Sequence, residues 1–464
     1  MREGRPHAHV HGLSDRVMPA LAQSLAVRGL WVTGGGPASR DTQNHLQKVG
    51  VTVLPPATMR CLRSETCLLV HGATVRRDHP VRLSATRRGI PQATPESWLR
   101  WSMRGRTGLA FMGGREAAVA AAMAGWVLTC AGKDPSVLLS FRSPQLGGWS
   151  RTGEGAPVVA ELSGDPEALS RVGAGLNVLL RLGADPWLDM SAWRAAYRRH
   201  RDACPPGAKV FAYGHPSLVD ESSAARENPA ADDDATTWVS FQPGSDWWGA
   251  DLRLEPAQSR FRVFQQGRFV TEVVLGVLGR RNALGALTAV AVCSELGVPV
   301  RETREALREF AGLSRDFEAR GSFRGVTLVD DAADDSAQVH HAISLARGAF
   351  GRRRLWAVYA ASGGAADSEV SRLVAALAGA ERVLLTHSET SPQAEEARAA
   401  ALALARGLAA AGVPARAWPD VSATLTDLDR SLEPGDVLLT LGGGDVGTIA
   451  DAFIRRLPRD RQGG

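Results

Sequence analysis

Two consecutive glycines, Gly113 and Gly114, stand where this chain could bind a phosphate group. An apolar, strand-like run over residues 108–112 precedes them, and an alanine-rich run typical of a helix follows. Backbone N–H groups at the start of a helix bind anions such as nucleotide phosphates. A phosphate loop also needs a lysine and a serine or threonine, but Ala117 and Ala118 occupy those positions. The pattern therefore predicts the setting of an ATP site without its phosphate-binding side chains.

No other lysine in this region can replace the missing one. The chain has only three lysines, and none lies between Lys48 and Lys133. Lys133 follows the predicted helix 117–131, and a helix rises about 1.5 Å per residue, so Lys133 lies too far from the glycines to reach a phosphate. Arg115 and Glu116 stand between the glycines and the alanines. A phosphate at this turn would therefore meet an arginine and a carboxylate.

Length and composition are those of a globular protein with several domains. The chain has 464 residues, 44% of them hydrophobic and 22% charged, which predicts roughly two to four domains. It has no apolar run of 18 residues, so we expect no membrane span. The N-terminus lacks the apolar core of a secretory signal, and we expect a cytoplasmic protein.

The spacing of the cysteines and histidines predicts neither a metal site nor a disulfide framework. The five cysteines are scattered and form no CxxC pair. His7, His9 and His11 alternate as on one face of a strand, while His340 and His341 are neighbours on a predicted helix and point apart. We expect packing or surface roles for these histidines and predict no metal. The cysteines are Cys61, Cys67, Cys130, Cys204 and Cys293.

The positive charge of the chain does not indicate a nucleic-acid partner. The formal net charge is +5, but the arginines are spread through the sequence without a dense basic run interleaved with aromatic residues. We therefore predict no nucleic-acid binding.

The order of apolar runs predicts three α/β segments. Residues 1–104 alternate short strands with helices, which is typical of a Rossmann-like domain. Residues 105–313 open with the glycine turn and predict an ATPase-like domain, in which the polar stretch 221–234 forms a surface loop or hairpin. Residues 314–464 again alternate strands and helices and predict a doubly wound, Rossmann-like parallel sheet.

The glycine turn and its helix resemble a motif of the Mur ligases, whose loop reads Gly-Thr-His-Gly-Lys-Thr-Thr-Thr. Gly113 matches the first glycine, and residues 131–136 match the end of the family's helix, Ala-Gly-x-Asp-Pro-Thr, without a gap. The family's second glycine, its lysine and its next threonine fall on Glu116, Ala117 and Ala118. The resemblance spans nearly the whole chain and is greatest to the MurC type, UDP-N-acetylmuramate–L-alanine ligase. It implies a three-domain α/β fold with Rossmann-like first and last domains and a central domain derived from a P-loop ATPase.

Later motifs of the family are also present in altered form. Gly-Arg-His-Asn falls on residues 279–282, where the asparagine is kept and the histidine is lost. Arg-Arg-Phe falls on residues 315–317. Asp-Asp-Tyr-x-His-His falls on residues 330–335, where the histidine pair becomes an aspartate pair. The resemblance implies nucleotide-binding roles for Gly113, Gly114, Arg115, Asn282, Arg315, Asp330 and Asp331.

The ligand-binding loops of the family are also altered in this sequence. Its UDP-binding loop, Gly-Ile-Gly-Gly-x-Gly-Met, falls on residues 12–18, where Gly12 is kept and Asp15 would place a negative charge near a pyrophosphate. Its metal-binding motif, Glu-Ala-Asp-Glu-Ser-Asp, falls on residues 161–166, and Asn-Ile-Glu-x-Asp-His falls on 181–186. Gly-Ala-Gly-Asp-Ile falls on residues 442–446. The resemblance implies ligand-loop roles for Gly12, Gly442, Gly443, Gly444 and Asp445.

Structural roles compete with each of these functional ones. For the glycines at 113–114, a tight strand-to-helix turn is the favoured interpretation and an anion site is the alternative. The aspartates at 330–331 contact a nucleotide or form a capped strand end with surface charge. For Asp334 and Asp335 we favour the start of a helix over a cation site. The segment 442–445 is a strand-to-helix turn with or without a ligand contact.

The resemblance implies ATP-dependent formation of an amide between a carboxylate and an amino acid. Coordinated losses at the ATP, metal and UDP motifs predict a pseudoenzyme without a cofactor, which acts as a regulator or partner of peptidoglycan-synthesis enzymes. Two alternatives stay open. The chain could be an active ligase with a rebuilt site, in which Arg115 or Arg281 supplies the lost charge for Mg-ATP and a UDP-muramoyl ligand binds. It could also be a non-enzymatic binding module.

Overall fold

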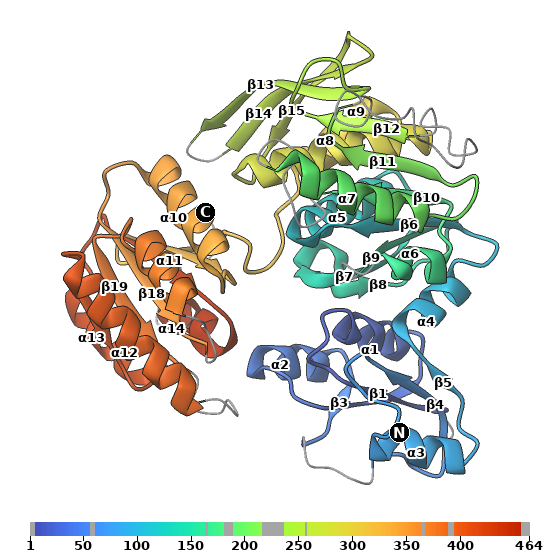
Figure 1. The fold of residues 1–464 in the computed structure, drawn as a ribbon, viewed down its shortest axis with the longest axis horizontal. Coiled ribbons are helices and arrows are strands. Elements are labelled where there is room, and N and C mark those ends of the chain that lie inside the picture. The colour runs from blue at the N-terminus through green and yellow to red at the C-terminus, as the bar shows by residue number, and fades with distance from the viewer. Residues whose placement is uncertain are drawn as a thin grey trace. The chain divides into compact units, whose positions relative to one another are not determined.

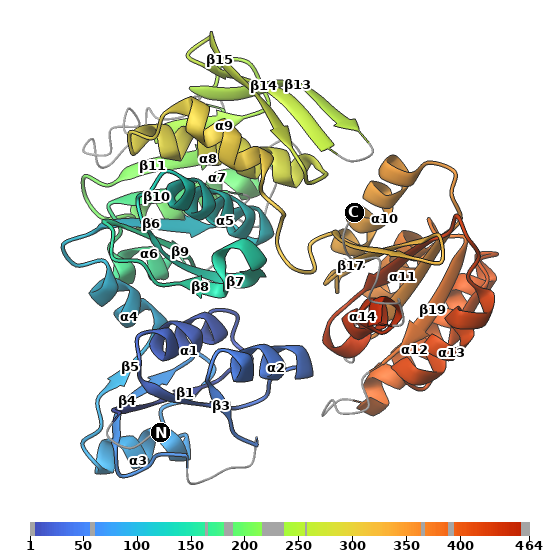
Figure 2. The same ribbon diagram turned by 180° about the vertical axis from the view of Figure 1, so that it is seen from behind.

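The computed structural model describes residues 5–55, 61–162, 166–180, 189–215, 236–255, 258–362, 367–387 and 394–455. The predicted loop 221–234 and the motif positions 163–165 and 181–186 lie outside these ranges. The chain forms two compact units, one made of residues 1–38 and 42–313 and the other of residues 39–41 and 314–464 (Figure 1). In both units, helices pack against β-sheets (Figure 2). No helix in the described part of the chain is both long and apolar enough to span a membrane.

The N-terminal sheet is parallel and has the strand order β3-β2-β1-β4-β5. Its central strand, β1, is buried along most of its length because neighbouring strands pair with both of its edges. The strands are β1 (His7–His11), β2 (Trp31–Gly35), β3 (Thr52–Val53), β4 (Thr66–His71) and β5 (Gln92–Ala93). The helices are α1 (Met18–Val27), α2 (Arg40–Lys48), α3 (Pro80–Arg87) and α4 (Pro95–Ser102).

The second sheet of the first unit has the strand order β15-β14-β13-β12-β11-β10-β6-β9-β7-β8. Its middle is parallel, and the antiparallel strands β13 to β15 extend one side. The strands are β6 (Thr107–Met112), β7 (Ser136–Ser143), β8 (Gly148–Arg151), β9 (Pro157–Glu161), β10 (Leu176–Leu179), β11 (Lys209–Tyr213), β12 (Thr236–Ser240), β13 (Trp247–Glu255), β14 (Gln258–Gln265) and β15 (Arg268–Leu275). The helices are α5 (Gly114–Cys130), α6 (Glu167–Val172), α7 (Met190–Asp202), α8 (Arg280–Glu295) and α9 (Val300–Arg308).

Helices α5 and α8 pack closely because both are rich in small residues. A Cβ atom added at Gly285 would lie 2.6 Å from Cγ1 of Val119 and 3.3 Å from the backbone nitrogen of Ala120. Alanines of both helices are fully buried in one hydrophobic core. This packing fixes the two helix N-termini, which carry Glu116 and Arg281.

The second unit contains the doubly wound sheet that the sequence predicts. Its strand order is β16-β17-β21-β18-β19-β20, and only the edge strand β16 runs antiparallel to its neighbour among these pairs. Helices α10, α11 and α12 cover one face, and α13 and α14 cover the other. The strands are β16 (Glu318–Phe323), β17 (Val326–Asp331), β18 (Leu355–Ala360), β19 (Arg382–Thr386), β20 (Ala415–Ala417) and β21 (Val437–Leu441). The helices are α10 (Ser336–Phe350), α11 (Asp367–Leu377), α12 (Ala394–Ala410), α13 (Val421–Ser431) and α14 (Thr448–Arg455).

Candidate functional site

The glycine turn joins β6 to α5 and has room for glycine only at its first position. Gly113 has a φ of +134°, and a Cβ atom there would lie 1.3 Å from the carbonyl oxygen of Leu180. Gly114 has a φ of +67° and is the first residue of α5, so this helix begins three residues before the predicted start at Ala117. The geometry supports a tight strand-to-helix turn, because Leu180, which continues the parallel pairing of β10 with β6, lies directly against Gly113.

A carboxylate of the chain itself lies in the first turn of α5. The side chain of Glu116 is 11% exposed, and its Oε1 lies 3.5 Å from Nε of Arg281, whose side chain is 12% exposed. A negative charge at this place is stabilised by the partial positive charge of the helix N-terminus. Ala117 and Ala118 are fully buried and face the core instead of the turn. The position that would attract a phosphate is thus next to an internal ion pair.

Arg115 and Arg16 both lie against the ring of Phe141. Their guanidinium carbons are 5.2 Å and 5.9 Å from the ring centroid, within cation–π range. Arg115 is half-buried at the start of α5. The structure therefore places a cation from the N-terminal segment and a cation from the glycine turn on one aromatic side chain.

Glu161 is a buried carboxyl group on the strand next to the glycine turn. It pairs with Phe111 across β9 and β6, and it accepts hydrogen bonds from N and Oγ of Ser140 at 2.9 Å and 2.6 Å. Burial raises the pKa of Glu161 to about 7. Glu161 begins the altered acidic motif but is not among the site residues predicted from the sequence. Its place at the end of a strand next to β6 was the signal that could have identified it.

Asn282 lies one residue after Arg281 in α8 and is buried. Its Nδ2 donates to the carbonyl oxygen of Leu278 at 2.7 Å. Its Oδ1 has no hydrogen-bond partner within the described ranges. The structure thus brings Asn282 and Arg281 at the start of α8 close to Glu116 at the start of α5. The two residues of the ion pair, Glu116 and Arg281, are 165 positions apart in the sequence.

In the second unit, Arg315 and Asp330 form a bidentate ion pair. Nε and NH2 of Arg315 lie 2.9 Å and 3.3 Å from the two carboxylate oxygens of Asp330, and NH2 also donates to the carbonyl oxygen of Gly442 at 2.7 Å. Thr440 donates to the same carboxylate at 2.6 Å. These bonds connect the ends of β17 and β21 and use both carboxylate oxygens of Asp330.

The carboxylate of Asp331 binds backbone groups both before and after β17. It accepts from the backbone nitrogens of Phe317 and Ala333, both at 2.8 Å. Asp330 and Asp331 are 0% and 2% exposed, so the alternative that they carry surface charge is wrong. Their backbone and arginine partners explain why these carboxylates can be buried.

The glycine segment after β21 is a turn into a short 3-10 helix, Gly444–Gly447. Gly442 and Gly444 have φ values of +109° and +66°, and Gly443 is extended and exposed. Asp445 is half-exposed, and its backbone oxygen accepts from Thr448. The predicted strand-to-helix turn is therefore present, and Gly442 adds its contact with Arg315.

Asp15 fills the turn that follows β1. Gly12 has a φ of +98°, and its nitrogen donates to the carbonyl oxygen of Gly35. The carboxylate of Asp15 accepts from Oγ1 of Thr74 at 3.0 Å and lies where a Cβ on Gly72 would be, 1.8 Å from that position. This second glycine turn thus also holds a carboxylate of the chain.

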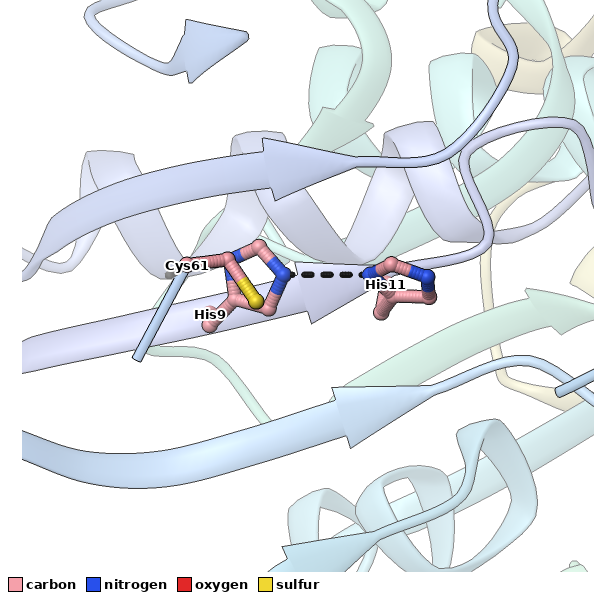
Figure 3. Close-up of side chains that lie close together, drawn as sticks. All are labelled: His9, His11 and Cys61. Carbon is pink, nitrogen blue, oxygen red and sulfur yellow. Dashed lines mark hydrogen bonds between the residues drawn. The ribbon is translucent and has the colours of Figure 1, made fainter. Parts of the chain in front are cut away.

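His9 and His11 of β1 lie close to Cys61, as Figure 3 shows. Nε2 of His9 lies 3.2 Å from Nδ1 of His11. The ligand atoms of His9, His11 and Cys61 all lie within 4.8 Å of one another. Burial lowers the pKa of His9 to about 3 and those of His7 and His11 to about 4, so the imidazoles are neutral near pH 7. The sequence gives no sign of this proximity, because Cys61 is 50 residues from His11 and shares no motif with it.

The aspartates before α10 have the structural role favoured from the sequence. Asp335 is the N-cap of α10 and accepts from the backbone nitrogen of Gln338 at 2.8 Å. A cavity of about 230 Å³ lies beside them, and Tyr359 borders it and donates to the backbone oxygen of Asp334.

The sheets and turns described above have the three-domain architecture of the Mur ligases. The crystal structure of UDP-N-acetylmuramate–alanine ligase from Thermotoga maritima matches with a TM-score of 0.76 at 20% identity, over 97% of this chain and 98% of that chain. A murein peptide ligase from Psychrobacter arcticus matches with a TM-score of 0.68 at 18% identity, over 97% and 98%. The expected fold class is thereby confirmed.

The sequence comparisons find Mur ligases similar to this chain. Residues 317–444 match the family described as Mur ligase, glutamate ligase domain. UDP-N-acetylmuramate–L-alanine ligase from Anaeromyxobacter dehalogenans (strain 2CP-1) is 27% identical over 99% of both chains. The protein of that name from Nitratidesulfovibrio vulgaris (strain DP4) is 27% identical over 96% of this chain and 98% of its own. The chain is thus MurC-like: residues 317–444 match a Mur ligase domain, and nearly the whole chain is similar in sequence and fold to UDP-N-acetylmuramate–L-alanine ligases.

Proposed function

We propose that this chain is a MurC-like member of peptidoglycan-precursor metabolism that has lost most ATP-dependent ligase activity. It acts as a regulator or partner of active cell-wall enzymes. The observation that carries the proposal is the pair of Glu116 and Arg281 at the first turn of α5. The helix N-terminus that would hold a nucleotide phosphate already has an anion, and that anion has its own counter-ion.

The chemistry of the family makes this substitution costly. Phosphoryl transfer depends on positive charge and backbone donors around the transferred group. Loss of one preorganised donor typically lowers the rate by about 10²–10³-fold, although losses within one site do not add. Here the lysine and threonine positions are Ala117 and Ala118, both fully buried. Neither alanine supplies a charge, a metal ligand or a hydroxyl group.

The turn after β1 supports the same proposal independently. Asp15 lies against Gly12 and Gly72 and is held by Thr74. A UDP pyrophosphate in this turn would meet a carboxylate. We propose that acidic side chains block the phosphate positions in both turns. The chain then retains the fold of the family but no longer binds ATP or the UDP compound.

The remaining site residues have a structural role in this proposal. Arg315, Asp330, Asp331 and Gly442 hold the ends of β17 and β21 together, and Asn282 continues the first turn of α8. We propose that they are the remnant of a nucleotide site. Gly443, Gly444 and Asp445 are the most accessible part of it.

One observation favours a second candidate, an active ligase with a rebuilt site. Arg115 and Arg281 are cations at the two helix N-termini that border the turn. A rearrangement of Glu116 would break its ion pair with Arg281, and we propose that this guanidinium would then bind a phosphate in a bidentate fork. Mg-ATP would then be the cofactor and a UDP-muramoyl compound the ligand.

We also propose domain boundaries for the chain. Residues 1–104 form a Rossmann-like domain, 105–313 an ATPase-like domain and 314–464 a second Rossmann-like domain. The three sheets support this division, since each lies within one of the segments.

A ligase assay separates the two candidates. Phosphate release and amide formation are measured with Mg-ATP, UDP-N-acetylmuramate and L-alanine, with the Thermotoga maritima enzyme as positive control. We expect no turnover above the rate without protein. Turnover comparable to the control that falls in Arg281→Ala would establish the active ligase instead.

A further inference from the structure

The N-terminal sheet contains a cluster of metal-ligating side chains that has no role in the proposed function. His9 is fully buried in the middle of β1, His11 lies at its end and Cys61 is buried beside them. Their side chains come together from β1 and from the segment that precedes β4 (Figure 3). Imidazole nitrogen and thiolate sulfur are ligands that zinc prefers.

The spacing of the two imidazoles fits one metal ion. With Zn–N bonds of about 2.0–2.1 Å, two nitrogens at tetrahedral positions lie roughly 3.3 Å apart. Nε2 of His9 and Nδ1 of His11 are 3.2 Å apart. The sulfur of Cys61 completes this group, since one ligand atom from each of the three residues lies within 4.8 Å of the other two.

The partners of His9 allow Nε2 to bind a metal in exchange for its hydrogen bond with His11. Nδ1 of His9 lies 2.8 Å from Oγ1 of Thr33, and the same oxygen lies 2.9 Å from Nε2 of His7. When Nδ1–H donates to Thr33, Nε2 keeps its lone pair. Histidine ligands of metals commonly donate their other ring N–H in this way, which fixes the ring orientation.

Gly35 leaves open the space that borders both nitrogens. A Cβ atom at this position would lie 2.8 Å from Nδ1 of His11 and 3.0 Å from Nε2 of His9. Any other residue would therefore place a carbon atom against both candidate ligands. The glycine is required here by space, since its φ lies outside the range that favours glycine.

We propose that the N-terminal sheet binds one Zn²⁺ ion through Nε2 of His9, Nδ1 of His11 and Sγ of Cys61. The thiol proton of Cys61 is released to solvent on binding, and the sulfur binds as the thiolate. The fourth position is taken by water. Thr33 orients His9, and the ion connects the segment at Cys61 to β1, next to the turn at Gly12. This site is independent of the ATP turn and of the proposed loss of ligase activity.

The test uses the full chain, reduced and stripped of metal with a chelator. It is titrated with Co²⁺ and the absorption is followed, after which Zn²⁺ is added to displace the cobalt. We expect one equivalent to bind and to give a thiolate-to-metal charge-transfer band. Cys61→Ser abolishes that band, and His11→Gln weakens metal affinity by about a hundredfold or more. Thr33→Val weakens it by about 10–100-fold, as expected for an orienting residue.

Two matched variants control for the other thiols. Cys67→Ser changes an exposed cysteine of β4 and Cys204→Ser a buried cysteine between α7 and β11, and both should leave the band unchanged. X-ray absorption spectroscopy at the zinc edge of the zinc-bound, unaltered protein should show one sulfur and at least two nitrogen neighbours. This measurement does not depend on the folding of any variant. No stoichiometric binding, a zinc shell without sulfur, or a band that persists in Cys61→Ser would overturn the proposal.

Discussion

Two acidic residues, Glu116 and Asp15, carry most of the functional argument. Each lies in a glycine turn at the end of a parallel strand, the place where α/β proteins bind phosphates. Glu116 has an arginine partner, and Asp15 is held by a threonine. A carboxylate repels a phosphate directly, and it also satisfies the helix N-terminus that would have attracted one.

Glu116→Gly should restore anion binding at the first turn of α5. The change removes the carboxylate and leaves the guanidinium of Arg281 without that partner. We expect the affinity for Mg-ATP to rise by about tenfold or more relative to the unaltered chain. Isothermal titration calorimetry measures it. Glu116→Asp keeps the charge and should show no gain in affinity for Mg-ATP. An unchanged affinity in a folded Glu116→Gly protein would argue against the proposal that the carboxylate of Glu116 blocks the phosphate position.

The elements were the most predictable part of the molecule. The strand before Gly113, the helix after it and the alternation of strands and helices over 314–464 follow from local apolar patterns. The start of α5 was misplaced because glycine is a poor helix former, although Gly114 opens the helix. The contact of Leu180 with Gly113 depends on the pairing of β10 with β6, which no local pattern relates to this turn.

Gly113→Ala should strongly destabilise the first unit. Its new Cβ would overlap the carbonyl oxygen of Leu180, at 1.3 Å, and the backbone has a positive φ. We expect a loss of about 3 kcal/mol or more in the free energy of unfolding. Gly114→Ala is the matched control, because only Glu116 Oε2 at 4.0 Å is near its Cβ, and it should cost about 1 kcal/mol. Equal losses of unfolding free energy in denaturant titrations would contradict the close contact of Gly113 with Leu180.

Asp436→Asn should make the second unit less stable and less sensitive to acid. Burial acts to raise the pKa of Asp436, but hydrogen bonds from Arg354 and the backbone of Glu433 outweigh it and lower the pKa below its usual range. A lowered pKa in the folded state means that the stabilisation is complete above the ordinary aspartate pKa of about 3.9 and is lost as pH falls through the folded value.

For this variant we expect a loss of about 2 kcal/mol at pH 7 that shrinks as the pH falls through the folded pKa. Denaturant titrations at a series of pH values measure it. Glu433→Gln is the control, since Glu433 pairs with the same arginine but its side chain is 71% exposed, so its loss should be below about 1 kcal/mol. A pH-independent difference between Asp436→Asn and the unaltered protein would show that the charge is not responsible.

At the scale of the whole molecule, the family resemblance predicted the fold, while the sites required the structure. The ion pair of Glu116 and Arg281 joins residues 165 positions apart, and the histidine cluster needs a cysteine that lies in no motif. Such contacts depend on how sheets and helices pack, which local periodicity does not specify. Burial of Asp330 and Asp331 was likewise invisible, because their partners Arg315 and Phe317 approach only in the folded chain.

Residues 314–464 should fold when expressed alone. Their sheet has a hydrophobic core on each face, and both cores are made of residues from this segment only. We expect cooperative unfolding with native-like helical content, since the segment has the size of an ordinary domain. Circular dichroism with denaturant titration tests this. A non-cooperative transition would contradict the proposed boundary at residue 314.

The most direct test of the central claim is a calorimetric titration of the whole protein with Mg-ATP, alone and after addition of UDP-N-acetylmuramate. The account predicts no heat of binding up to millimolar nucleotide in either case, because carboxylates occupy both phosphate turns. Micromolar binding of Mg-ATP that strengthens with UDP-N-acetylmuramate would contradict it and would establish that the site has been rebuilt.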